Sequence, residues 1–133
     1  MQVLIKNVRI CTAQNSTAPQ DIRIENGLIQ AVGNKLPMEP GVRELRFEQD
    51  VYASPGWMDV GVQTGDPGHE HREDLQSVAR AAAAGGFTAI ACAPNTQPPT
   101  DSKSAIVYIQ NKTAENIVRF HPIGALSVGT AGV

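Results

Sequence analysis

Hydrophobic and polar positions at the start of the chain follow the pattern of short β-strands. Apolar residues dominate positions 3–11 and alternate with polar ones over 21–25, which is typical of half-buried strands. Asn26-Gly27 then predicts a hairpin turn, because both central residues of a type I′ turn need a positive φ. Further strands are predicted over residues 28–32, 42–47 and 51–53. We therefore expect a small antiparallel β unit that is short of strands of its own.

Strands and helices alternate beyond this unit. Residues 57–62 and 87–92 are short apolar runs, which predict two buried strands. Apolar residues between them recur at helical spacing and predict a helix over 73–84, namely Leu75, Val78, Ala79, Ala82 and Ala83. Gly85-Gly86 is expected to end that helix. The pattern is that of a βαβ unit in a parallel sheet.

A second helix and a third strand are predicted after this unit. Asp101 or Ser102 is a suitable N-cap for a helix that runs to about Lys112. Residues 118–126 then form another apolar run with strand character. The sequence thus favours an α/β fold in which strands and helices follow one another.

Length and charge narrow the class of protein. The 133 residues allow one domain with a core, but a complete (β/α)₈ barrel takes roughly 250 residues. A net charge of −2 and no basic patch argue against nucleic acid as a partner. No apolar run has the length of a membrane span and no signal segment is recognisable, so we expect a cytoplasmic protein. Two buried thiols are favoured for Cys11 and Cys92, with a disulfide left open.

Three motifs carry a resemblance to a known family. They are PGWMDVGVQTGDPG over residues 55–68, AAAGGFT over 82–88, and PNT over 94–96 with Pro98 and Asp101. Together they resemble the opening of the barrel in the dihydroorotases, which are cyclic amidohydrolases, in particular those of the multifunctional-complex type. The family pattern is PG, two hydrophobic residues, then D-x-H-x-H-x-x-(E/D)-P-G. The resemblance covers about fifty residues without a gap.

The resemblance implies a particular domain organisation. Residues 1–54 would be the N-terminal part of a composite β-sandwich whose remaining strands come from a C-terminal segment. Residues 55–133 would start a metal-dependent-hydrolase-like TIM barrel, with three of its eight β/α units, so that the barrel is incomplete in this chain. We expect the chain to be the front of a longer protein.

The departures from the family pattern affect its chemistry. The two strand histidines that bind the catalytic zinc in the family correspond to Gly61 and Gln63, and the arginine that grips the substrate carboxylate corresponds to Gly65. Glycine offers zinc no ligand, and a carboxamide is a poor one. We therefore expect no metal site, no cofactor and no catalytic residue in this chain alone.

Other polar residues are weaker candidates for function. By resemblance, Asn95 would help to hold the substrate carboxylate; the alternative is an asparagine that forms the turn. Asp59 would be structural, in the barrel floor, while Asp66 and Arg72 would order the loop. For His69-Glu70-His71 we favour a solvated helix N-terminus over a surface metal site. For His121 we favour a hydrogen-bonded core or rim position over a ligand.

The function implied by the resemblance is that of a dihydroorotase-like hydrolase of pyrimidine biosynthesis. The family reaction is the reversible ring closure of carbamoyl aspartate to dihydroorotate. Because the zinc pair is missing, we expect a non-catalytic copy, a pseudoenzyme. One alternative is a structural partner of aspartate carbamoyltransferase, a role that inactive family members have. Another is an active zinc-dependent enzyme whose remaining ligands lie outside this chain. A third is a fragment that folds through self-association.

Overall fold

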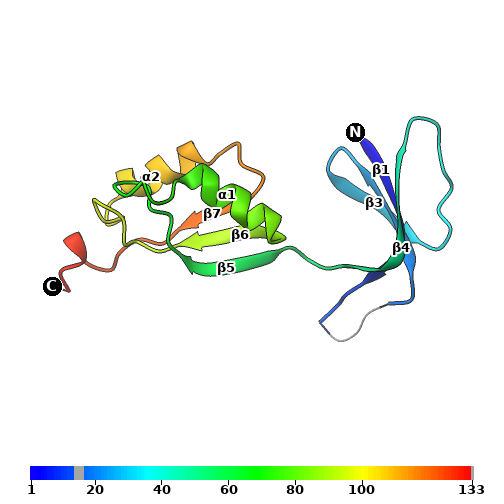
Figure 1. Cartoon of the computed structure of the whole chain (residues 1–133), viewed down its shortest axis with the longest axis horizontal. Helices are drawn as coiled ribbons and strands as arrows, with labels where there is room; N and C mark the ends of the chain where they lie inside the picture. Colours follow the sequence, from blue (N-terminus) through cyan, green and yellow to red (C-terminus); the bar gives the residue numbers. More distant parts are fainter. Residues whose placement is uncertain (14–16, 133) are drawn as a thin grey trace. The chain divides into compact units, whose positions relative to one another are not determined.

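The chain divides into two compact units, each with its own sheet. The computed structural model describes residues 1–13 and 17–132 (Figure 1). One unit comprises Met1–Pro55 and the other begins at Gly56. Residues 12–20 are polar and contain a proline, which predicts a loop, and this segment lies partly outside the described residues. The assignment of 1–54 to a composite sandwich and of 55–133 to a barrel stays a prediction.

The first unit is a mixed four-stranded sheet in the order β3-β2-β1-β4. Its strands are β1 (Gln2–Ile10), β2 (Gln20–Glu25), β3 (Leu28–Gly33) and β4 (Arg43–Ala53). The turn at Asn26-Gly27 has φ of 50° and 80°, which confirms the predicted hairpin geometry. The prediction of an all-antiparallel unit is wrong, because β4 runs parallel to β1. The connection from β3 carries the chain back across the sheet before β4 begins.

Strand β4 is longer than the sequence predicted. Two short strands were expected on either side of residues 48–50, but one strand continues through them. The register shifts between the Lys6–Arg46 pair and the Val8–Val51 pair, so the intervening residues of β4 bulge from the ladder. A bulge interrupts the alternation of apolar and polar residues without ending the strand.

The second unit is a parallel sheet in the order β5-β6-β7. Its elements are β5 (Trp57–Val62), α1 (Leu75–Ala84), β6 (Phe87–Cys92), α2 (Lys103–Lys112), β7 (Arg119–Pro122) and a 3₁₀ turn, Val128–Thr130. The βαβ prediction is confirmed. Helix α1 starts after an Asp74–Ser77 capping box, two residues later than expected, and Ser102 caps α2. Strand β7 is shorter than the predicted 118–126, since it ends at Pro122, which has no N–H to donate.

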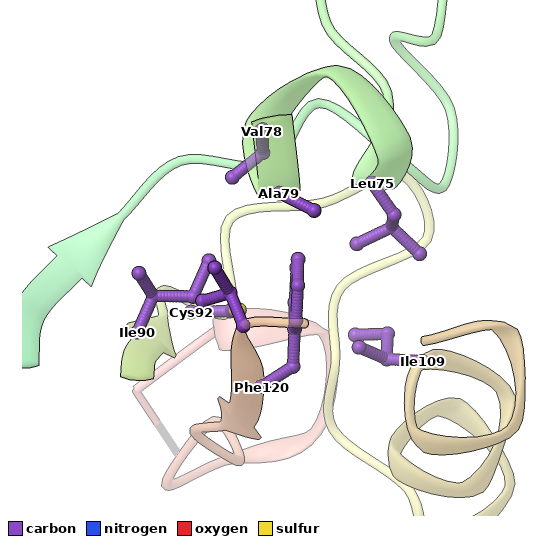
Figure 2. Packing of buried hydrophobic residues seen from close by; sticks show 8 residues of the cluster. Leu75, Val78, Ala79, Ile90, Cys92, Ile109 and Phe120 are labelled. Atoms are coloured by element: carbon purple, nitrogen blue, oxygen red, sulfur yellow. The ribbon is translucent and has the colours of Figure 1, made fainter. Parts of the chain in front are cut away.

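Both helices pack on one face of this sheet and bury its core. Leu75, Val78 and Ala79 of α1 and Ile109 of α2 point toward side chains of β6 and β7 (Figure 2). The strand residues of this cluster are Ile90, Cys92 and Phe120, with Val118 just before β7. The core therefore sits between the sheet and the two helices, and it fixes where each strand ends.

Strand β5 is not the buried strand that its apolar sequence predicts. Trp57, Met58 and Val60 are 63%, 48% and 70% exposed. The strand lies at the edge of the sheet, where β6 is its neighbour, and the helices cover one face only. Asp59, expected in a barrel floor, is exposed as well. An apolar sequence therefore indicates that a strand can be buried, but whether it is buried depends on which other elements pack against it.

Candidate functional site

A polar cleft lies where β5 and β6 end. Its volume is about 320 Å³. The backbone N–H of Ala93 donates to the carbonyl of Val62 at 2.9 Å, so the two strand ends are held side by side. The cleft is lined by Gln63, Gly65, His69, Arg72, Glu73 and Asn95. Carboxyl ends of parallel strands are the usual place for a site in α/β proteins, and the cleft is therefore the candidate site.

The structure brings some of the predicted residues together and leaves one apart. Gln63, Gly65 and Asn95 all line the cleft. Gly61 does not. It lies at an irregularity of β5, between the pairs Val60–Ala91 and Val62–Cys92, with a φ of +88°. A side chain at residue 61 would meet no atom within 4 Å, but the backbone has a conformation that L-residues rarely adopt.

The loop after β5 closes over Gly65. The N–H of His69 donates to the carbonyl of Gly65 at 2.6 Å, and the N–H groups of Arg72 and Glu73 donate to the carbonyl of His69 at 2.9 and 3.3 Å. Gly65 has a φ of +68°, and a Cβ there would lie 2.4 Å from the carbonyl oxygen of Glu73. The tight turn therefore requires glycine at this position, and the same turn delivers His69, Arg72 and Glu73 to the cleft.

An ion pair between a buried carboxylate and a partly exposed lysine, which no sequence pattern indicated, ties this loop to α2. The Asp66 side chain is fully buried and accepts hydrogen bonds from Tyr108 Oη at 3.0 Å and Lys112 Nζ at 2.7 Å. Lys112 Nζ also donates to Tyr108 Oη at 2.9 Å. The hydrogen bond to Asp66, and then that to Tyr108, raises the pKa of Lys112 above its ordinary value. Asp66 thus orders the loop, as expected, through partners from a distant helix.

The sequence carried one signal for this cluster. Tyr108 and Lys112 are four residues apart, so they lie on the same face of α2. Asp66 is 42 residues before Tyr108, however, and no pattern within one sequence links positions at that distance. Periodicity in the sequence therefore could not identify Tyr108 and Lys112 as the partners of Asp66.

The three histidines differ in their surroundings. His69 is half-buried in the cleft wall, and its ring meets the ring of the exposed His71 edge-on, with centroids 6.2 Å apart. Both precede α1 by several residues and lie in the loop, so the helix N-terminus is Asp74 instead. Glu70 accepts the N–H of Gly68 at 2.9 Å, which lowers the pKa of its carboxyl group. His121 is exposed, which excludes the core position of the predicted core or rim, and the rim position stays a prediction.

The two cysteines are both free thiols, as favoured from the sequence. Cys92 belongs to the core of the second unit, where burial raises the pKa of its thiol to about 11. Cys11 is half-buried, so the expectation of two buried thiols holds for Cys92 alone. A buried thiol with a raised pKa is unreactive, and Cys92 is a packing residue.

The cleft does not fit a catalytic zinc ion. Its lining offers the imidazole of His69 and the carboxylate of Glu73, which accepts a hydrogen bond from Ser77 Oγ. Within residues 1–13 and 17–132, no three His, Cys, Asp or Glu side chains are grouped so that they would hold a metal ion. Catalytic zinc takes three protein ligands and an open position. The residues that line the cleft include an arginine, a histidine, a glutamate and two residues with carboxamide side chains, which suit a small polar molecule.

Comparison with known proteins identifies the family to which the residues of this cleft belong. The family model described as dihydro-orotase-like matches residues 52–132. Two curated dihydroorotases, from Geobacter metallireducens and Geobacter sulfurreducens, are 37% and 40% identical to the chain over 134 aligned residues. Each alignment covers 99% of this chain and 31% of the relative, so the chain spans about a third of the length of these curated relatives.

Solved structures agree with this result. The L-hydantoinase (dihydropyrimidinase) of Arthrobacter aurescens matches 92% of this chain and 27% of its own, with a TM-score of 0.73 and 25% identity. A D-hydantoinase matches 97% of this chain and 29% of its own, with a TM-score of 0.73 and 26% identity. A dihydroorotase with 20% identity and a TM-score of 0.66, matched over 96% of this chain and 32% of its own, shares the fold.

No helix in the described part of the chain is long and apolar enough to cross a membrane. The fold is α/β, with a mixed sheet and a parallel sheet that correspond to a portion of these enzymes. The family match extends over most of the second unit and includes every residue of the cleft. On this evidence, the chain belongs to the dihydroorotase-like family.

Proposed function

We propose that the chain is part of a cytoplasmic dihydroorotase-like protein of pyrimidine biosynthesis that binds the ring compound without converting it. Two findings support the proposal. The family match covers the cleft, and the cleft presents polar side chains suited to a small cyclic amide that carries a carboxylate. The positions that would hold zinc by resemblance are Gly61 and Gln63, so the chain keeps a place to bind and lacks the means to activate water.

The backbone at Gly61 carries this proposal. If only the ligand side chains had been replaced, the backbone of the strand could still accept histidines at these positions. Here the strand has an irregular register and a φ of +88° at residue 61, a conformation that favours glycine. An L-residue in such a conformation costs about 1–2 kcal/mol. A histidine at residue 61 would therefore be strained, so the backbone as well as the side chain disfavours a ligand at that position.

The finer fold is also a proposal. We infer that the first unit is part of a composite β-sandwich and that the second begins a TIM-type barrel. The support is the order of the second unit, in which three parallel strands alternate with helices that cover one face. The exposed apolar residues of β5 suit a strand that receives further neighbours.

An active enzyme is the second candidate. Identity of 37–40% with curated dihydroorotases along nearly the whole chain favours it. The two candidates differ in turnover. We expect the protein, supplied with zinc, to form no dihydroorotate from carbamoyl aspartate and to hydrolyse none in reverse, because Gly61 offers no ligand atom. An ultraviolet assay of the ring amide against a zinc-dependent relative measures this, and zinc-dependent turnover would refute the non-catalytic role.

A structural role beside aspartate carbamoyltransferase would explain why a frame without the metal pair persists. Support for this role comes from the resemblance to non-catalytic family members, because the exposed apolar residues of β5 are already assigned to further strands of the barrel. We expect the full chain and the transferase to co-elute in gel filtration at micromolar concentrations. Separate elution at those concentrations would count against the partnership, and a larger species of the chain alone would indicate self-association instead.

A further inference from the structure

Arg72 is a cation in the lining of the cleft, and among residues 1–13 and 17–132 its side chain has no ion-pair partner. Its side chain lines the cleft beside Asn95 and Gln63. The ion pairs of the described residues involve Lys6, Arg9, Arg23 and Lys112, and none involves Arg72. Its backbone N–H is bonded to the carbonyl of His69, which fixes the residue in the loop, while the guanidinium makes no hydrogen bond in the described part of the chain. A fixed backbone and an unpaired guanidinium are what an anion site needs.

The loop that carries Arg72 depends on Gly65. A side chain at residue 65 would collide with the carbonyl oxygens of Glu73 and His69, at 2.4 and 3.1 Å from its Cβ. The place where the family resemblance puts an arginine is therefore occupied by the backbone of the loop. That same backbone places Arg72, seven positions further along the chain, in the lining of the cleft.

We propose that Arg72 is the specificity-determining residue of this cleft and selects ring compounds that carry a carboxylate. The inference rests on the proposed ligand-binding function and adds the residue that sets its selectivity. A guanidinium binds a carboxylate through two parallel N–H donors, which is a strong and directional contact. The carboxamides of Gln63 and Asn95 present both donors and acceptors, as the edge of a cyclic amide does.

Glu73 limits how many carboxylates the ligand carries. Its carboxylate lines the same cleft and is held by Ser77 Oγ, so it stays near the ligand as an acceptor. A second carboxylate next to it would be repelled, whereas a ring N–H would be bound. The cleft thus fits a ring with N–H groups on one side and one carboxylate on the other.

Two probe compounds separate the contribution of the carboxylate from that of the ring. Dihydroorotate carries one carboxylate, and dihydrouracil is the same ring without it. In calorimetric titrations of the full chain, we expect dihydroorotate to bind at least tenfold more tightly than dihydrouracil. Arg72→Gln should remove that preference by weakening dihydroorotate binding about tenfold while it leaves dihydrouracil binding unchanged, and Arg72→Lys should recover part of it.

A matched control uses the same change of charge elsewhere. Arg80 is an exposed residue of α1 that does not line the cleft, and Arg80→Gln should alter neither affinity. Ligand-induced shifts of the side-chain amide signals of Gln63 and Asn95 should persist with dihydrouracil in Arg72→Gln. Equal loss in both arginine variants, or an unchanged preference in Arg72→Gln, would overturn the role of Arg72 and leave the proposed function intact. Binding of neither ring by the unaltered chain would refute both.

Discussion

Replacement of Lys112 with methionine is expected to destabilise the second unit by about 3 kcal/mol. The change leaves the fully buried carboxylate of Asp66 without its cation, and loss of one partner of a buried ion pair costs about 3–5 kcal/mol. The lower end applies because 42% of the Lys112 side chain is exposed, so water already shares in its interactions. A loss of this size lowers the thermal midpoint of a unit of this length by roughly 12–24 °C, which differential scanning calorimetry measures.

Three comparisons isolate the buried carboxylate as the cause. Lys103→Met makes the same chemical change at an exposed position of α2 and should shift stability by less than about 0.5 kcal/mol. Asp66→Asn in the Lys112→Met background should recover part of the loss, because the orphaned charge is gone. The pKa of Lys112 is raised, so its contribution is complete below pH 10.5 and is lost only as the pH rises beyond that value. If Lys112→Met is as mild as Lys103→Met, the ion pair does not hold the loop.

Substitution of Gly65 by arginine, the residue that the family resemblance places there, is expected to lower both the stability of the protein and its affinity for dihydroorotate. The new Cβ would lie 2.4 Å from the carbonyl oxygen of Glu73, and a positive φ alone costs about 1–2 kcal/mol. The loop must move to relieve the contact, and Arg72 moves with it. We therefore expect a stability loss of more than about 2 kcal/mol and at least tenfold weaker binding of dihydroorotate. Chemical denaturation and titration calorimetry measure the two effects.

Gly124 provides the control for this substitution. It has no atom within 4 Å of an added Cβ, and its φ lies outside the left-handed region. Gly124→Arg introduces the same side chain into the same unit and should leave both stability and binding near those of the unaltered chain. Tighter dihydroorotate binding by Gly65→Arg at unchanged stability would mean that the cleft still accepts an arginine from the family position.

Local rules predicted the elements of this molecule well. The Asn26-Gly27 hairpin, the βαβ unit and the Ser102 cap all follow from residues a few positions apart, where backbone geometry decides the outcome. The parallel pairing of β4 with β1 was not predictable, because strand direction depends on the path of the connection. The exposure of β5 was missed for a related reason, since burial depends on what neighbours the strand has.

The candidate site was likewise predictable from the sequence only in part. The resemblance pointed to Gln63, Gly65 and Asn95, and these three line the cleft. It gave no indication that Gly61 would lie apart with a positive φ, because a family pattern assumes the family backbone. Arg72 was assigned to ordering the loop and His69 to a solvated helix N-terminus. Their place in the cleft results from the closure of that loop over Gly65, which only the folded backbone reveals.

Zinc stoichiometry tests the central claim most directly. The full chain is dialysed against buffered micromolar zinc and its metal content is measured by plasma mass spectrometry, with an active dihydroorotase treated alongside. We expect far less than one equivalent in this protein, because a glycine and a carboxamide stand where two imidazoles would bind. One equivalent of zinc that survives dialysis, and is lost when Gln63 becomes alanine, would contradict the account.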